Sequence, residues 1–195
     1  MDKVSYALGL SLGNNLISSG ITSLNISKLS QGIKDGLEQN QPEISYQEAQ
    51  DVINEYFQNL QSKMSAKTIE EGKAFLESNG KRPEVVTLKS GLQYEVIREG
   101  NGPVPTATNT VKVHYHGTLI DGTVFDSSVR RGEPAAFGVT QVISGWVEAL
   151  QLMPVGSKWK LYIPSDLAYG AQGAGQHIGP HTTLVFEVEL LGIEK

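Results

Sequence analysis

Two aromatic side chains and one carboxylate are the first residues in this chain that could do chemistry together. Residues 111–119 alternate between apolar and polar side chains, which is the pattern of a half-buried strand. Asp121-Gly122 predicts a tight hairpin turn, and residues 123–125 supply the returning strand. The hairpin brings three side chains together: Tyr115, Phe125 and Asp126. This grouping at a strand end is unusual for residues that serve only as core.

Several kinds of chemistry are excluded or disfavoured by the sequence. The absence of cysteine excludes disulfides, thiolate catalysis and Cys-ligated metal. No Gly-x-Ser-x-Gly elbow is found, because the one match, Gly9-Leu-Ser-Leu-Gly13, lies within a helical pattern and not at a strand-to-helix turn. The Gly-x-x-x-x-Gly-Lys motif is missing, and the Gly-rich residues 170–175 do not fit a dinucleotide-binding motif. Two histidine pairs, His114 with His116 and His177 with His181, leave a metal site as an alternative to ordinary surface histidines. Nothing places the pairs together and no carboxylate completes a ligand set, so we expect neither metal nor cofactor.

Composition is that of a soluble globular protein, with 39% apolar and 19% charged residues. The net charge of -5 offers no basic surface to nucleic acid or to an anionic membrane. No apolar run approaches the ~20 residues of a membrane span, and residues 1–10 do not resemble a signal peptide. We expect a cytoplasmic protein that binds neither nucleic acid nor membrane. The alternative is a periplasmic or cell-surface protein from which a signal peptide was removed.

The first 80 residues have helical periodicity. Apolar residues recur at helical spacing over residues 4–16 and again over 26–37, where Asn25 is a suitable N-cap. Ser45-Tyr-Gln-Glu48 matches a capping box and begins a third, much longer helix, which we expect to end at Asn79. The first half of this helix has an apolar stripe. The second half is mostly polar, which favours a solvated stalk that joins two bodies.

The apolar stripe on residues 49–64 is more apolar surface than two short helices can cover. Small helical units often complete their core by oligomerising, so we predict self-association through residues 1–65. The alternative is that the stripe folds back onto the C-terminal half of the same chain.

From Thr87 onward the periodicity becomes strand-like. Strands are expected at residues 92–97, 111–119, 123–125, 158–163 and 183–191, a short helix at 145–150 and a long Gly-rich loop at 168–180. This pattern predicts an α+β domain, in which an antiparallel curved sheet wraps one short helix, after an all-α N-terminal domain. The expected divisions are a helical dimerisation domain (1–44), a linking helix (45–80) and the α+β domain (81–195).

Five segments of the α+β domain carry a family resemblance. They are Val113-His-Tyr-His-Gly117, Gly122-Thr-Val-Phe-Asp-Ser-Ser128, Val142-Ile-Ser-Gly-Trp146, Ala168-Tyr-Gly170 and Thr183-Leu-Val-Phe-Glu-Val-Glu-Leu190. Together they resemble the FK506-binding-protein (FKBP) family of peptidyl-prolyl cis–trans isomerases over nearly all of residues 88–195. The helical half is similar to dimeric bacterial members of the macrophage-infectivity-potentiator type. In those proteins a long helix carries the isomerase domain away from an intertwined N-terminal dimer.

The resemblance implies an enzyme that rotates X-Pro bonds in an apolar bowl and so assists protein folding, without a cofactor. The positions implied for catalysis are Tyr115, Phe125, Asp126, Tyr169 and Phe186. Those implied for substrate binding are Phe137, Val142, Ile143, Trp146 and Ile178. Trp146 would form the floor, while the Ile143 N–H and the Tyr169 hydroxyl would hold substrate carbonyls. The implied partners are proline-containing unfolded chains, FK506- or rapamycin-type macrolide inhibitors, and a second copy of the chain.

Asp126 on its own is a typical turn residue. Its pairing with Tyr115 across the hairpin, together with the resemblance, favours a role in the bowl. We expect it to accept hydrogen bonds from Tyr115 or from a neighbouring basic side chain, and to shape the polarity of the bowl more than it moves protons.

Two competing functions remain at this stage. The chain could be a chaperone or peptide-binding module, in which a V-shaped dimer grips unfolded chains with two bowls, and this role can coexist with catalysis. It could also be a purely structural dimer with a vestigial bowl. Taken singly, Trp146 and Phe186 are typical core residues. Tyr169 lies in a Gly-rich loop, which is not a normal core position.

Overall fold

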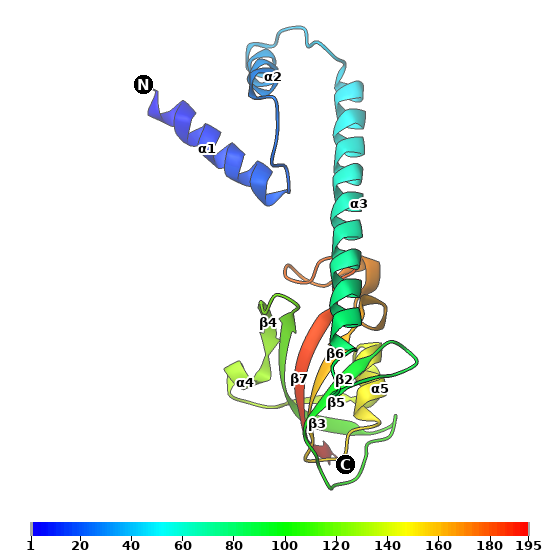
Figure 1. Ribbon diagram of the computed structural model, residues 1–195. Helices are drawn as coiled ribbons and strands as arrows, with labels where there is room; N and C mark the ends of the chain where they lie inside the picture. The colour runs from blue at the N-terminus through cyan, green and yellow to red at the C-terminus, as the bar shows by residue number, and fades with distance from the viewer. Residues whose placement is uncertain (1, 195) are drawn as a thin grey trace. The chain divides into compact units, whose positions relative to one another are not determined.

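The computed structural model describes residues 2–194, which form two compact units (Figure 1). The first unit ends at Lys63 and the second begins at Met64. None of the described helices combines the length and the apolarity needed to cross a membrane.

The first unit contains helices α1 (Lys3–Ser18) and α2 (Ile26–Glu38) and the beginning of α3 (Tyr46–Asn79). As predicted, the Asn25 side chain caps α2 by accepting the N–H of Lys28 at 3.1 Å. Ser45 Oγ accepts the N–H of Glu48 at 3.1 Å. This is half of the predicted capping box, because within residues 2–194 the Glu48 carboxylate makes no return bond to Ser45.

Apolar side chains of the first unit lie open to solvent. Helices α1 and α2 contain no buried residue. The strongly exposed apolar side chains of this unit include Val4, Tyr6, Leu8, Ile33, Leu37, Val52, Ile53, Tyr56 and Phe57. The stripe predicted on the first half of α3 is therefore present and uncovered in the single chain.

The second unit is built on one antiparallel sheet of seven strands. Six of them follow the order β1-β2-β6-β7-β3-β4, and β5 pairs with β3 beside this path. The strand bounds are β1 Val85–Thr87, β2 Gln93–Arg98, β3 Thr110–Leu119, β4 Val124–Ser127, β5 Ala135–Gly138, β6 Lys158–Ile163 and β7 Leu184–Glu194. The short helices are α4 Ser128–Arg131 and α5 Ser144–Leu150, with 3-10 turns at Val139–Gln141, Ser165–Leu167 and Gly170–Gln172.

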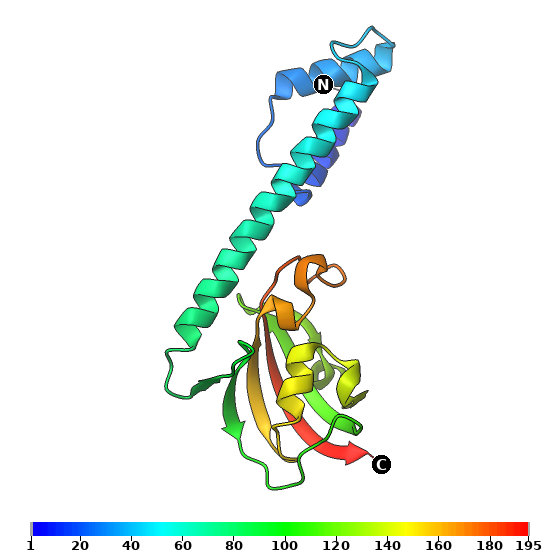
Figure 2. The same cartoon turned by 90° about the vertical axis from the view of Figure 1, so that its right-hand side faces the viewer.

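Helix α5 lies against one face of this sheet, as Figure 2 shows. Trp146, Ala149 and Leu150 are buried there against strands β3, β6 and β7, in one continuous hydrophobic core. The predicted alternation of β3 is confirmed, since Val111, Val113 and Tyr115 face this core. The antiparallel sheet on one short helix is thus the expected α+β architecture. The strands β1 and β5 escaped the sequence patterns. The three residues of β1 are too few to show a period, and the four residues of β5, Ala-Ala-Phe-Gly, do not alternate between apolar and polar side chains.

The end of α3 is not a solvated stalk, which corrects the sequence expectation. Gly72 and Asn79 are buried, and the half-buried Phe75 and Leu76 pack on a second small core of the sheet. Asn79 Nδ2 donates to Gln93 Oε1 at 2.9 Å, and Gln93 Nε2 donates back to the Leu76 carbonyl at 2.8 Å. The last two turns of the helix, residues 72–79, are therefore packed on the sheet of the second unit.

This packing makes a stability prediction. Replacing Phe75 with Ala removes a half-buried ring whose centroid lies 6.0 Å from that of Tyr162, and should lower the free energy of unfolding of the second unit by about 1–3 kcal/mol. Both tryptophans of the chain, Trp146 and Trp159, lie in this unit, so their fluorescence in a urea titration of the full chain reports it alone. The exposed neighbour Ser78, changed to Ala, is the control. Equal midpoints for the two variants would show that the helix end does not stabilise the sheet.

Candidate active site

A cavity of about 680 Å³ opens between α5, the sheet and the Gly-rich loop. It is lined by all ten residues singled out from the sequence: Tyr115, Phe125, Asp126, Phe137, Val142, Ile143, Trp146, Tyr169, Ile178 and Phe186. Gln141, Ala174, Gly175, Gln176 and His177 complete the lining. The structure thus brings every predicted residue to one place, while their roles in binding and catalysis stay predictions.

The floor of this bowl is the Trp146 indole, which is 4% exposed. Three rings meet it close to perpendicular, with centroid distances of 5.2 Å to Phe186, 5.5 Å to Tyr115 and 6.0 Å to Phe137. Phe125 extends this wall by an edge contact to Phe186 at 5.4 Å. Edge-to-face pairs of this kind each add ~0.5–1.5 kcal/mol beyond burial, so the rings hold one another in place.

Gly117 on β3 makes this aromatic wall possible. A Cβ atom at this position would lie 2.7 Å from Phe125 Cζ and 2.8 Å from Phe186 Cε1. The rings of both phenylalanines therefore occupy the space that any other residue would fill. This explains why the alternating strand carries a glycine at this core-facing position, between Tyr115 and Leu119.

Two hydrogen-bond donors at the bowl have no partner among residues 2–194. The Ile143 N–H, just before α5, makes no hydrogen bond there, and neither does the Tyr169 hydroxyl, although Tyr169 is 41% exposed. Both are available to an incoming carbonyl group. A third donor, Trp146 Nε1, is buried without an acceptor beneath them, and an unpaired buried donor is costly.

Asp126 forms a closed polar triangle at the rim with Tyr115 and Arg131. The Tyr115 hydroxyl donates to Asp126 Oδ2 at 2.5 Å, and Arg131 Nη1 donates to Asp126 Oδ1. Arg131 Nη2 donates to the Tyr115 oxygen at 2.7 Å. Asp126 thus accepts from both Tyr115 and a neighbouring basic side chain, the two donors that we expected as alternatives.

The triangle perturbs the acidity of its members. Burial raises the pKa of Asp126, but the hydrogen bonds from Tyr115 and Arg131 outweigh it and hold that pKa below its ordinary value. Burial and the hydrogen bond to Asp126 raise the pKa of the Tyr115 phenol. Asp126 is therefore an anion and Tyr115 a neutral donor near neutral pH. Neither group is tuned to exchange protons there.

Helix α4 supports the triangle, because it carries Arg131. Ser127 Oγ caps this helix by accepting the Arg130 N–H at 3.2 Å and lies 2.9 Å from His116 Nδ1. The fully buried Ser128 hydroxyl accepts the Tyr115 N–H at 2.8 Å. The Asp126-Ser-Ser128 sequence thus supplies an acceptor, a cap and an internal anchor in three successive residues.

The histidine pairs do not form a metal site in the part of the chain that the structure describes, where no cluster of three potential ligands occurs. His114 Nδ1 lies 3.0 Å from Ser128 Oγ, the hydroxyl that binds the Tyr115 backbone. His116 in the same way contacts Ser127, the residue that caps α4. The ordinary structural interpretation of these two histidines fits the geometry.

Sequence reasoning missed Arg131 as a named residue of the site. Arg131 lies four residues beyond Ser127. That spacing places it near Asp126 only if residues 128–131 form a helical turn, which the sequence analysis did not predict. Gln141, Gln176 and His177 were also missed, because no periodicity marks residues in turns and loops.

Comparison with known proteins identifies the family. The model for the FKBP-type peptidyl-prolyl cis-trans isomerase matches residues 102–191, and the model for the domain amino terminal to such isomerases matches residues 1–96. The chain therefore belongs to the FKBP-type peptidyl-prolyl cis-trans isomerases, of the kind that carries this amino-terminal domain.

Individual relatives cover the whole chain. It is 48% identical to the FKBP-type 22 kDa peptidyl-prolyl cis-trans isomerase of Escherichia coli, over 98% of this chain and 94% of the relative. It is 46% identical to the Outer membrane protein MIP of Legionella longbeachae, over 100% of this chain and 86% of the relative. Among solved structures, the crystal structure of FkpA from Escherichia coli matches with a TM-score of 0.80 and 38% identity, over 98% of this chain and 95% of FkpA. The expected family resemblance and the helical-plus-sheet architecture are confirmed.

The triangle makes a prediction about acidity. Changing Arg131 to Gln removes a charge-assisted bond, so the Asp126 pKa should rise towards its ordinary value, as carboxyl carbon NMR shifts during a pH titration would measure. Because the folded-state pKa is depressed, the stability that the pair contributes is present above the ordinary unfolded pKa of ~3.9 and is lost as pH falls through the folded value.

Arg130, the preceding residue of α4, provides the matched control for this titration when changed to Gln. Its side chain makes no hydrogen bond or ion pair to Asp126. An Asp126 pKa that is the same in both variants would contradict the account of the triangle.

Proposed function

We propose that the chain catalyses cis–trans rotation about X-Pro bonds by non-covalent stabilisation of the twisted amide, and so assists protein folding. The observation that carries this proposal is the aromatic floor at Trp146, with two unpaired donors, the Ile143 N–H and the Tyr169 hydroxyl, beside it. The family supplies the reaction, and the geometry supports a mechanism for it.

The physical reason begins with amide resonance. This resonance stiffens the C–N bond, with a barrier of ~18–20 kcal/mol, and X-Pro bonds exchange isomers over tens to hundreds of seconds. A twisted amide has lost the resonance and is less polarised than the planar form. A water-poor aromatic bowl therefore favours the twisted form over the planar one, which is differential binding of the transition state. The reaction requires no covalent intermediate.

Each lining group has a role in this proposal. Trp146 supports the proline ring, and Tyr115, Phe125, Phe137 and Phe186 surround it. The Ile143 N–H and the Tyr169 hydroxyl hold the carbonyls that flank the proline, which fixes the chain on both sides of the rotating bond. Val142 and Ile178 complete the apolar wall. Asp126 orients Tyr115 through the triangle and sets the polarity of the rim.

The activity can be tested by exchange NMR on a short X-Pro peptide. The parent chain should accelerate exchange, and a macrolide of the FK506 type, which we propose as a ligand of the same bowl, should abolish the effect. Tyr169→Phe removes one hydroxyl from the site and should lower kcat/KM about two- to ten-fold, the worth of one hydrogen bond.

Tyr94→Phe is the control for this substitution, since Tyr94 stacks on Trp159 at 4.3 Å and does not line the bowl. Peptide binding without any acceleration would refute the enzymatic role and leave a peptide-binding module. Equal rates for Tyr169→Phe and the parent would remove Tyr169 from the mechanism.

A homodimer through residues 1–65 is the second part of the proposal. It is supported by the exposed apolar side chains of α1, α2 and the first half of α3, which a lone chain leaves in water. The domain divisions at 44/45 and 80/81 remain predictions. Two bowls in one assembly would raise avidity for unfolded chains, so a chaperone role alongside catalysis is the second candidate function.

Light scattering of the full chain should give the mass of two chains. Introducing charge into the apolar stripe, with Val52→Glu and Phe57→Glu together, should shift the mass to that of one chain, because burying two carboxylates in an apolar interface is prohibitive. Val129→Glu, at an exposed apolar residue of the second unit, should leave the mass unchanged. A monomeric parent would contradict the proposed dimer.

The cellular location is also a proposal. The comparisons do not support the expected cytoplasmic location, and one full-length relative is named an outer membrane protein. This supports the alternative of an exported protein, in the periplasm or at the cell surface.

A further inference from the structure

We infer that His177 makes the bowl selective for an acidic side chain next to the substrate proline when its imidazole is protonated. This inference rests on the proposed isomerase function and deepens it. It assigns a substrate preference to His177, a rim residue that has no role in the non-covalent mechanism proposed above.

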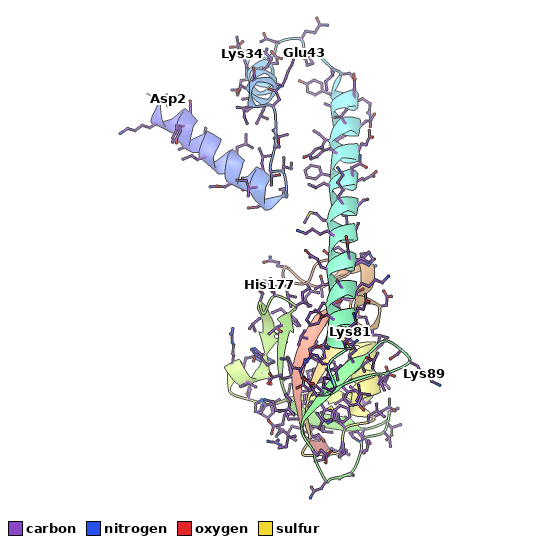
Figure 3. The ribbon with its side chains drawn as sticks, viewed as in Figure 1. Asp2, Lys34, Glu43, Lys81, Lys89 and His177 are labelled. Atoms are coloured by element: carbon purple, nitrogen blue, oxygen red, sulfur yellow. The ribbon has the colours of Figure 1, made fainter. Side chains whose placement is uncertain are left out.

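The loop tip that carries His177 has a defined backbone. Residues Ala174 and Ile178 form an isolated antiparallel bridge, in which the Ala174 N–H donates to the Ile178 carbonyl at 2.8 Å and the Ile178 N–H donates back at 3.2 Å. The bridge closes a short loop with Gly175, Gln176 and His177 at its tip. The tip lies between the 3-10 turn Gly170–Gln172 and β7, where Figure 3 labels His177.

The side chain of His177 is part of the bowl and is free to act. It lines the cavity next to the buried wall residue Ile178, yet it is exposed to solvent. Its ring makes no hydrogen bond or ion pair with any residue in the described range 2–194. A protonated imidazole there would face the cavity without an internal counter-charge.

The other ionisable groups of the lining cannot supply this preference. Asp126 is an anion already engaged by Arg131 and Tyr115. Tyr115 is held neutral by its raised pKa, and the Tyr169 phenol has no positively charged form that could attract a carboxylate. Among the residues that line the bowl, His177 is the one histidine, the side-chain type that proteins use as a charge switch near neutral pH.

The size of the bowl brings the neighbour of the proline to the rim. A cavity of about 680 Å³ is of the size that holds a drug-sized ligand, and therefore more than one proline ring. The floor is entirely aromatic, so a charged side chain beside the proline must lie along the rim. There an acidic side chain would be attracted by the imidazolium of His177, and a neutral side chain would gain no such electrostatic attraction.

The experiment compares matched peptides by exchange NMR. One pair carries Glu or Gln before the proline, and a second pair carries Glu or Gln after it. The ratio of kcat/KM for Glu over Gln is measured with the full chain at about pH 5.5 and about pH 8, because a Glu carboxylate with a pKa of ~4.3 is ionised at both. In at least one pair the ratio should be about 1.5- to 5-fold higher at the lower pH, as expected for an exposed ion pair. Molar salt should abolish the difference.

Two histidine variants decide whether His177 is responsible. His177→Asn should make the ratio independent of pH. His181→Asn should keep the pH dependence, because His181 lies on the same loop but lines a separate cavity of about 500 Å³; Asn also tolerates its positive φ of 58°.

Each outcome is decisive. A pH-independent ratio in the parent for both pairs, or a pH dependence that survives in His177→Asn, would overturn the inference and leave the isomerase function intact. A chain that accelerates none of the four peptides would overturn the proposed function, and this inference with it.

Discussion

The edge-to-face contacts of Trp146 are the constraint on which the second unit depends. The indole anchors α5 to the sheet and at the same time forms the floor of the bowl. Gly145 permits this approach, since a Cβ atom there would lie 2.6 Å from Ile163 Cγ2 on β6. Core and site are therefore one structure. A change that loosens the packing of α5 also opens the floor on which the proline would rest.

The rim is built by a different principle. Its polar groups bind one another: Asp126, Tyr115 and Arg131 form a triangle, and Ser127 and Ser128 attach that triangle to helix α4 and to the backbone of β3. Fully satisfied networks of this kind are rigid. Beside this fixed rim, the Ile143 N–H and the Tyr169 hydroxyl have no partner within residues 2–194, and these two donors are suited to hold a peptide. The rim groups bind one another, while the two donors stay available to the substrate. This arrangement fits a reaction in which the position of the substrate and the low polarity of the site matter more than proton transfer.

Local features and tertiary contacts were predictable to different degrees. The hairpin at Asp121-Gly122, the alternation of β3 and the caps at Asn25 and Ser45 were readable because each is a local rule with a short-range physical cause. The end of α3 was misread: Phe75 and Leu76 stand among charged residues, and only the tertiary contact with Tyr162 and Val185 shows that they pack.

The site shows the same contrast. Most of its aromatic members came from motifs on strands and on α5, Tyr169 came from a loop motif, and the structure gathers them into one cavity. Arg131 lies in a helical turn and His177 in a loop. In such segments no periodicity or spacing identifies which side chains belong to the site. Arg131 is placed by its hydrogen bonds to Asp126 and Tyr115, and His177 by the bridge between Ala174 and Ile178. Neither set of bonds follows from a residue pattern in the sequence.

The central claim is that the bowl accelerates rotation about the X-Pro bond by favouring a twisted amide in a water-poor aromatic site, without proton transfer. The solvent isotope effect on kcat/KM for an uncharged X-Pro peptide tests it most directly, in H₂O and D₂O at matched pH and pD. Non-covalent stabilisation predicts a ratio of about 1. A normal effect of about 2 or more would mean that a proton is transferred in the transition state, by general acid or base catalysis, and would contradict the account.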